Sequence, residues 1–287
     1  MNIVHSLWTK PLIFGNAPAK MRTFTDVNIA CYTASVLFAQ RQDLSVNLYA
    51  DGMGQELLSF LPYRERYVLT VPDSVPIDYW AAGKFFALKM MPLRDIHIDG
   101  DVFLIGAKKV NWTELLNKNA DLVIQSMEDQ GDKLTKYYTA AREIVNRYLP
   151  FFYPGTSANP SPAYNCGLVG FQSQKLKDEY ISAYMYGLSM LSSKEVIKAV
   201  RSTPNCVMDL VLEQQWLYQL VENTFPKAVI NNILGSGDTA YDKAERIGYT
   251  HLLGKYKENC IKEVLQTIEG MDKNIYKKCI DKMNSYK

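Results

Sequence analysis

The chain of 287 residues predicts an α/β fold, with a mixed, mostly parallel sheet flanked by helices and a helical C-terminal part. Two observations favour this class. Short apolar segments alternate with segments of helical periodicity in the first half of the chain, and helical periodicity dominates after residue 173. Hydrophobic residues make up 47% and charged residues 22%, which is typical of a globular protein and excludes a disordered one.

The expected strands are short, apolar and bounded by polar residues or glycine. They cover residues 3–8, 44–50, 66–71, 95–105, 121–127 and 164–171. The expected helices cover residues 25–39, 54–61, 78–91, 134–149, 174–191, 193–201, 207–223 and 258–284, with Thr25 as the N-cap candidate of the first.

The proline-rich segment 150–164 and the segment 229–239 are expected to be loops. No domain boundary is placed in the first loop, because residues 164–171 again have the pattern of a strand in the same sheet. The sequence therefore predicts a single domain over residues 1–257, with residues 258–287 as a helical extension packed on it.

Charge and cysteine content narrow the function classes. Thirty-two basic and thirty acidic residues give a net charge of +2, which argues against a nucleic-acid-binding protein. The five cysteines are widely spaced without a Cys-x-x-Cys pair, which indicates a reducing compartment rather than a disulfide scaffold or a cysteine zinc site. No signal-peptide pattern and no run of about 18 apolar residues is found. We therefore expect a soluble, cytoplasmic protein without a transmembrane segment.

Two carboxylates interrupt the apolar segment from Ile96 to Phe103, at Asp99 and Asp101. Carboxylates are rare in strands and costly to bury without partners. A divalent cation would offset their charge, and ligands bind at the carboxyl ends of strands in open α/β sheets. A turn is the alternative, because Asp-Gly is a common hairpin dipeptide. His97 is interpreted as a hydrogen-bonded core histidine.

A second signal lies downstream, in the His-x-x-Gly-x-x-Lys motif of residues 251–257. An imidazole combined with carboxylates suits a divalent metal such as Mn²⁺. Gly254 permits close approach of a ligand to the backbone, and Lys257 could reach a phosphate. The alternative is a structural histidine with solvated lysines. The motif favours a metal site only because Asp99 and Asp101 occur in the same chain.

Three motifs follow one another along the chain: Asp-x-Asp after an apolar strand, Asn-x-Gly in a later strand, and the late His-x-x-Gly-x-x-Lys. With these motifs in this order, the chain resembles the nucleotide-sugar glycosyltransferases of the GT-A fold, a Rossmann-type α/β fold. The order is similar to that of the retaining glycogenin and lipopolysaccharide galactosyltransferase type, glycosyltransferase family 8. The block from Ile96 to Phe103 also looks like that of a group of bacterial glycosyltransferase-like proteins. The resemblance covers residues 1–257 and departs after Lys257, where Glu258-Asn259 replace the family's Pro-Trp.

This resemblance implies a Mn²⁺ (or Mg²⁺) ion, a UDP-sugar as donor, and a carbohydrate or lipid-linked acceptor. The implied metal ligands are Asp99, Asp101 and His251, and Gly254 and Lys257 would hold the diphosphate. The other implied donor contacts come from three places. Lys84 is the basic residue, and Asn165 and Gly167 lie in the strand that flanks the donor sugar. The ends of the first two strands supply His5, Ser6, Trp8 and Asp51. A core position is the alternative for Trp8.

Four acidic residues are candidates for positioning the acceptor or stabilising an oxocarbenium ion: Glu128, Asp129, Asp209 and Glu213. Asp209 and Glu213 share one helix face, and a solvated face is their alternative. No residue is identified as the nucleophile. The metal ion would stabilise the departing nucleoside diphosphate as a Lewis acid.

Two other functions stay open. A nucleotidyltransferase would use the same paired aspartates, although residues 9–22 only partly supply its glycine-rich basic loop. A non-catalytic nucleotide- or carbohydrate-binding protein could keep the same fold. The tail 255–287, with eight lysines and five acidic residues, is expected to be a packing helix with a hydrated lysine face. A weak association with a membrane surface is the second interpretation of this tail.

Overall fold

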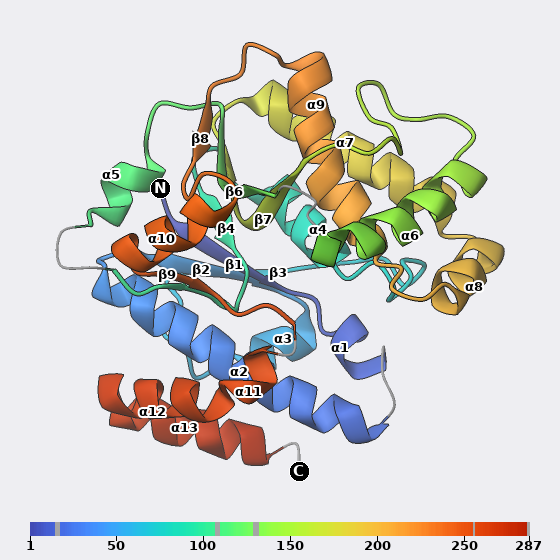
Figure 1. The fold of residues 1–287 in the computed structure, drawn as a ribbon. Helices are drawn as coiled ribbons and strands as arrows, with labels where there is room; N and C mark the ends of the chain where they lie inside the picture. The colour runs from blue at the N-terminus through green and yellow to red at the C-terminus, as the bar shows by residue number, and fades with distance from the viewer. Residues whose placement is uncertain (15–17, 107–109, 129–131, 255, 286–287) are drawn as a thin grey trace.

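The computed structural model describes residues 1–14, 18–106, 110–128, 132–254 and 256–285 (Figure 1). Its centre is a seven-stranded, mostly parallel sheet with strand order β3-β2-β1-β4-β7-β6-β8, and helices cover both faces. The predicted α/β class is confirmed. The strands are β1 (Ile3–Leu7), β2 (Val46–Ala50), β3 (Arg66–Val68), β4 (Ile96–Ile98), β6 (Leu122–Glu128), β7 (Ala163–Phe171) and β8 (Ile230–Asn232).

Strand β7 alone runs against its neighbours in this sheet, because it pairs antiparallel with both β4 and β6. The other pairs, β1 with β2 and β4, β2 with β3, and β6 with β8, are parallel. The carboxyl ends of β1, β4 and β6 and the amino end of β7 therefore meet at one edge. This is the edge at which open α/β sheets bind ligands.

A second sheet of two strands lies beside this edge. It pairs β5 (Val102–Leu104) antiparallel with β9 (Tyr249–His251). The expected single strand 95–105 is thus two strands in two different sheets. The alternative of a turn at Asp99-Gly100 is confirmed, since the Val102 amide donates to the Asp99 carbonyl oxygen at 3.0 Å. This turn does not close a hairpin, because β4 pairs with β1 and β7 whereas β5 pairs with β9.

Helices form two layers around the main sheet (Figure 1). One face carries α2 (Pro18–Arg41), and the C-terminal helices pack on its outer side. The other face carries α4 (Ala82–Met90), α6 (Asp132–Tyr148), α7 (Gln174–Leu191), the π-helix Leu210–Gln215 and α9 (Trp216–Thr224). The remaining helices are α1 (Lys10–Phe14), α3 (Gly52–Leu57), α5 (Trp112–Leu116), α8 (Lys194–Ser202), α10 (Asp238–Ile247), α11 (Tyr256–Asn259), α12 (Ile261–Met271) and α13 (Lys273–Asn284).

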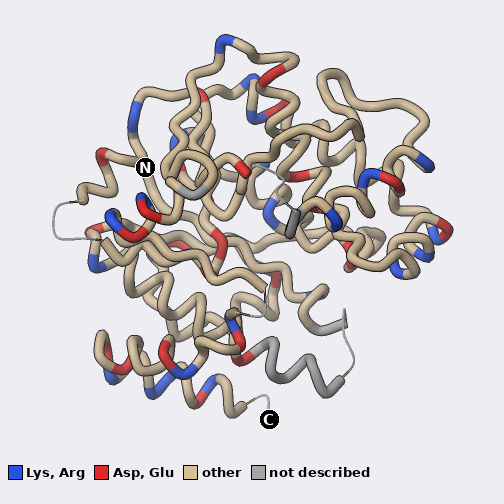
Figure 2. The backbone as a smooth tube through the Cα atoms, viewed as in Figure 1, with Lys and Arg blue, Asp and Glu red and all other residues tan. Residues whose placement is uncertain are grey.

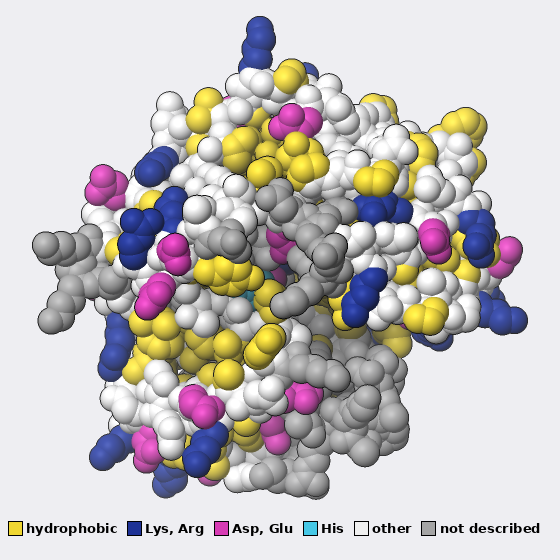
Figure 3. Space-filling model, viewed as in Figure 1, with side chains coloured by type: hydrophobic (Ala, Val, Ile, Leu, Met, Phe, Trp, Pro, Cys, Tyr) yellow, Lys and Arg dark blue, Asp and Glu magenta, His cyan; other side chains and the backbone are white. Residues whose placement is uncertain are grey.

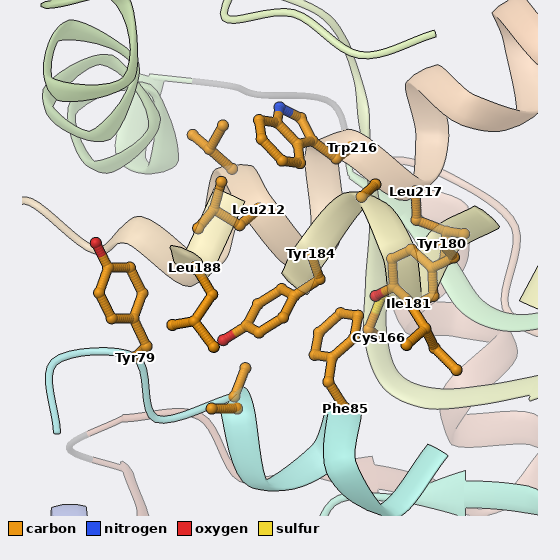
Figure 4. Close-up of a cluster of buried hydrophobic side chains, with 14 of the residues drawn as sticks. Tyr79, Phe85, Cys166, Tyr180, Ile181, Tyr184, Leu188, Leu212, Trp216 and Leu217 are labelled. Carbon is orange, nitrogen blue, oxygen red and sulfur yellow. The ribbon is translucent and has the colours of Figure 1, made fainter. Parts of the chain in front are cut away.

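The core between the sheet and α4, α7 and α9 is rich in aromatic rings (Figure 4). Phe85 stacks on Tyr184 with 3.5 Å between ring centroids and 7° between planes. Trp216 is fully buried, and its indole nitrogen donates to the Ser157 carbonyl oxygen at 3.1 Å. Apolar burial of this kind fixes the helices that carry polar residues toward the sheet edge.

Some expected boundaries differ from the structure. The helix predicted to begin at Thr25 begins at Pro18, and proline is favoured in the first helical turn. The segment 229–239, expected to be a loop, contains β8, which hydrogen-bonds to β6. The helix predicted over 258–284 lies across three helices, and Asp272 caps the last of them.

The C-terminal helices α12 and α13 pack on α2. Buried Val264 and Ile268 of α12 contact the apolar residues of α2, among them Ala30. Basic and acidic residues are interspersed along α12 and α13 (Figure 2). The expected limit at residue 257 falls inside α11. Within the described ranges, no helix is both long and apolar enough to cross a membrane.

Candidate functional site

Asp99, Asp101 and His251 converge at the sheet edge, where one ligand atom from each lies within 4.8 Å of the others. Asp99 follows β4, Asp101 precedes β5, and His251 ends β9. The β5–β9 pairing brings them together, because Val102 stands opposite His251 and the Leu252 amide donates to the Asp101 carbonyl oxygen at 3.0 Å. The predicted convergence is confirmed, whereas metal binding itself stays a prediction.

The ring of His251 is oriented by a buried amide. Its Nδ1 atom lies 2.9 Å from Oε1 of Gln125, which also accepts from the Tyr249 hydroxyl at 2.7 Å. Because an amide oxygen accepts, Nδ1 donates to Gln125, which leaves Nε2 as the ring atom that faces Asp101. That Nε2 atom lies 3.6 Å from Oδ1 of Asp101. An imidazole nitrogen and a carboxylate oxygen, both possible metal ligands, thus face each other.

Two glycines make room for this arrangement. A Cβ atom on Gly167 would lie 2.4 Å from the His251 ring and 2.5 Å from the Gln125 amide oxygen. A Cβ atom on Gly100, between the two aspartates, would lie 2.4 Å from the ring of Tyr32. The central glycine of the Asp-Gly-Asp motif is therefore required by close packing.

Each aspartate is paired with a lysine. The Nζ atom of Lys257 forms an ion pair with Oδ2 of Asp101. The Nζ atom of Lys84 lies 2.8 Å from Oδ1 of Asp99 and 2.7 Å from Oε1 of Glu213, and donates to the Cys166 carbonyl oxygen at 3.0 Å.

These charges shift each other's ionisation. Burial favours the neutral form of Asp101, but His251 and Lys257 outweigh it and hold the pKa of Asp101 well below its usual range. Burial likewise opposes the charge of Lys84, yet Asp99 and Glu213 raise the pKa of Lys84 above its usual value.

The spacing of the His-x-x-Gly-x-x-Lys motif has a structural reason. Gly254 adopts φ = 54°, a left-handed conformation that glycine tolerates. The backbone then turns into α11, with the Lys257 amide donating to the Gly254 carbonyl oxygen at 3.3 Å. This reversal after β9 returns Lys257 to Asp101, close to His251.

Glu213 and Asp209 are both fully buried, so the solvated-face alternative for them is wrong. Glu213 lies in the π-helix, a helix type found often at functional sites. Burial raises the pKa of Glu213 to about 7, and its Oε2 atom has no hydrogen-bond partner among the described residues. Asp209 accepts from the Ala81 amide and the Tyr184 hydroxyl, each at 2.9 Å, and burial raises its pKa to about 6.

Glu128, at the end of β6, belongs to a polar network beside the cluster. Its Oε1 atom accepts from the Asn165 amide at 2.6 Å, and its Oε2 atom accepts from the Tyr138 hydroxyl at 3.0 Å. The same hydroxyl lies 2.9 Å from Oε1 of Gln214, and the Asn165 side-chain oxygen accepts from the Gly167 amide at 2.9 Å. Asn165 and Gly167 thus link Glu128 to His251. The candidate Asp129 lies outside the described residues.

The candidates at the ends of β1 and β2 have protein partners. His5 is a core histidine: its Nδ1 and Nε2 atoms lie 2.9 Å from the Tyr63 hydroxyl and 3.0 Å from the Ser35 hydroxyl, and burial lowers its pKa to about 3. Trp8 is buried against Gly83, so its core alternative holds. The structure therefore does not bring these two side chains to the cluster.

Asp51 and Ser6 are likewise engaged. Asp51 caps α3, because its Oδ1 atom accepts from the Gly54 amide at 2.8 Å, and its Oδ2 atom accepts from the Thr9 amide at 2.7 Å. Ser6 lies nearer the cluster, with its hydroxyl 2.7 Å from Nε2 of His97. His97 is buried as predicted, and its Nδ1 atom lies 3.8 Å from Oδ1 of Asp99.

Sequence reasoning missed Gln125 and Tyr138. Gln125 carried a usable signal, since it is a polar amide inside the apolar strand of residues 121–127. Tyr138 carried none, because its helical spacing with apolar residues is also that of a core position. Figure 3 shows a hollow with a histidine and acidic side chains inside it and apolar side chains on either side.

A comparison with curated proteins found no match to this chain. A family model described as a family of unknown function, DUF6734, matches residues 1–284. The chain therefore belongs to the DUF6734 family.

Proposed function

We propose that the protein is a metal-dependent glycosyltransferase that transfers a sugar from a UDP-sugar to a carbohydrate or lipid-linked acceptor. The observation that carries this proposal is the convergence of Asp99, Asp101 and His251 at the ligand-binding edge of an α/β sheet. The order of motifs along the chain, and their resemblance to GT-A glycosyltransferases, supports the choice of donor.

The residues of the cluster fit a divalent cation. Two carboxylates and one imidazole form a donor set that suits Mn²⁺ or Mg²⁺. The Nε2 atom of His251 and the Oδ1 atom of Asp101, both possible ligands, face each other at 3.6 Å. Gln125 acts as the outer partner that fixes the ring, as is usual for metal-bound histidines.

Around this centre, the chain's own residues have separable roles. A bound Mn²⁺ ion would supply Lewis-acid stabilisation of the leaving diphosphate. Lys257, partly exposed on α11, would bind a phosphate oxygen, and Lys84 holds Asp99 in position through their ion pair. Glu128, kept in a fixed orientation by Asn165 and Tyr138, offers a carboxylate to sugar hydroxyl groups.

Thermal unfolding with UDP, with and without Mn²⁺, tests the proposal. A ligand at one hundred times its dissociation constant adds about 2.7 kcal/mol to the free energy of unfolding. We expect UDP to raise the melting temperature only in the presence of Mn²⁺, and the shift to vanish in Asp101→Asn. The matched control is Asp281→Asn, because Asp281 is exposed on α13; this variant is expected to keep the shift.

Other outcomes select the alternatives. Stabilisation by ATP or CTP and not by UDP would favour a nucleotidyltransferase. Metal-dependent UDP binding without release of UDP from any UDP-sugar would favour a non-catalytic binding protein. A wild-type protein that responds to no nucleotide in the presence of Mn²⁺ contradicts the proposal.

A further inference from the structure

The acidic pair of the cluster is already matched by positive charge within the protein. Asp101 is paired with Lys257, and Lys84 is shared by Asp99 and Glu213, so three carboxyl groups face two ammonium groups. Glu213 would compensate at most one of the two positive charges that a divalent cation entering alone would add to this mostly buried group. A nucleotide diphosphate entering alone would add at least two negative ones. Only the two together leave the local charge nearly unchanged.

The two lysines differ in how firmly they are held. Lys84 is 5% exposed and is fixed by Asp99, Glu213 and the Cys166 carbonyl oxygen together. The Lys257 side chain is 21% exposed and lies on α11, a helix of four residues with no buried side chain. Lys257 is therefore the lysine that can leave its aspartate at small cost in packing.

Lys257 also occupies the atoms that a metal ion needs. Its Nζ atom pairs with Oδ2 of Asp101, and the other oxygen of that carboxylate faces Nε2 of His251. A cation coordinated by Asp101 and His251 would lie close to the ammonium group, and the repulsion between the two charges would drive Lys257 away. The flexible side chain can then swing to a phosphate oxygen bound to the same ion.

We propose that the ammonium group of Lys257 is a stand-in for the metal ion: it pairs with Asp101 while the site holds no metal. When a nucleotide diphosphate binds, the metal ion takes this position on Asp101 and Lys257 leaves it. The proposal deepens, and rests on, the proposed function. Lys257 weakens binding of the metal ion alone and strengthens binding of the metal and diphosphate together. Binding of each ligand therefore raises the affinity for the other by the same factor.

The test is a Mn²⁺ titration that follows free Mn²⁺ by electron paramagnetic resonance, without UDP and with saturating UDP. In the wild type, UDP is expected to lower the Kd of Mn²⁺ by at least tenfold. In Lys257→Met, Mn²⁺ alone is expected to bind about fivefold tighter than in the wild type, and the effect of UDP is expected to shrink to less than threefold. Lys257→Gln should behave in the same way.

Two variants separate charge from other effects. Lys257→Arg keeps the positive charge and is expected to bind Mn²⁺ alone within twofold of the wild type. Lys262→Met removes an exposed lysine of the neighbouring helix α12 and is expected to change neither Kd. Melting temperatures in buffer without Mn²⁺ and UDP verify that each variant is folded.

The possible results separate this inference from the function proposed above. If Mn²⁺ alone binds to Lys257→Met no more tightly than to the wild type, the stand-in role is wrong, even where UDP and Mn²⁺ still bind together. A second result is that Lys257→Met binds Mn²⁺ more tightly but UDP alters the Kd of Mn²⁺ in no variant. Lys257 then competes with the metal ion, and the proposal of a UDP-sugar as donor is wrong. Absence of Mn²⁺ binding in both proteins overturns both proposals.

Discussion

Gly167 lies directly against the ring of His251, so closely that a Cβ atom there would be 2.4 Å from Cε1 of the imidazole. The same atom would lie 2.5 Å from the Gln125 oxygen to which the ring is hydrogen-bonded. Gly167 belongs to β7 and His251 to β9, which are strands of different sheets. The missing side chain lets the two sheets approach and gives the imidazole its orientation.

Replacing this glycine should disturb the cluster. In Gly167→Ala the added methyl group displaces the ring from its partners, and overpacking of this kind costs about 1–3 kcal/mol. Loss of a ligand's orientation typically reduces metal affinity by about 10- to 100-fold. We expect both effects, measured by urea unfolding and by Mn²⁺ titration.

The matched control is Gly270→Ala in α12, where an added Cβ would meet nothing within 4 Å. This variant should keep its Mn²⁺ affinity and lose no stability, because alanine is favoured over glycine in helices by up to about 1 kcal/mol. Unchanged Mn²⁺ affinity in Gly167→Ala would show that the ring position does not control binding.

Lys84 is the shared cation of two carboxylates, so its removal should be costly. In Lys84→Met, Asp99 and Glu213 lose the ammonium group between them, and breaking a buried ion pair from one side typically costs about 3–5 kcal/mol. Lys89→Met, an exposed position on the same helix α4, is the control and should change the free energy of unfolding by less than about 0.5 kcal/mol.

A double variant separates charge repulsion from lost packing. Lys84→Met combined with Glu213→Gln removes one of the two unpaired carboxylates, and should therefore be more stable than Lys84→Met alone. The measurement is urea unfolding at pH 7.5 and fixed ionic strength. Equal or lower stability of the double variant would mean that Lys84 acts through its packing and not through its charge.

Local chemistry in the sequence was enough to find the acidic pair. Asp99 and Asp101 stand out because two carboxylates interrupt an apolar strand, and the class of fold follows from the alternation of apolar and helical segments. His251 was found only through its motif. Its strand β9 has three residues and no visible alternation, so the pairing with β5 that brings His251 to Asp101 could not be predicted.

The burial of Glu213, Asp209 and His5 was not predicted from the sequence. Glu213 and Asp209 have the spacing of a hydrated helix face, yet both are buried because their segment packs under α4 and α7. His5 stands at a strand end in the sequence, but its partners Tyr63 and Ser35 come from other segments. Whether a polar residue faces solvent depends on such tertiary contacts, which residue spacing along one element does not encode.

Asp209 gives a prediction about pH. Burial raises its pKa from the ordinary value of 3.8 to about 6, so the folded protein binds a proton there more tightly than the unfolded chain. Its contribution to stability is therefore fully present below about pH 4 and falls as pH rises to about 6. A pKa difference of one unit corresponds to about 1.4 kcal/mol, so the raised pKa of Asp209 contributes a total near 3 kcal/mol to the free energy of unfolding. Most of this contribution is lost between pH 4.5 and pH 7.5.

The variant Asp209→Asn lacks this titrating group. The free energy of unfolding of the variant minus that of the wild type should therefore rise with pH. Between pH 4.5 and pH 7.5 we expect that difference to increase by about 2 kcal/mol in favour of the variant, whatever fixed loss the Ala81 or Tyr184 hydrogen bond adds. Urea unfolding of both proteins at these pH values measures it, and the other titrating groups cancel in the comparison. A difference that stays constant would show that Asp209 is ionised in the folded protein across this range.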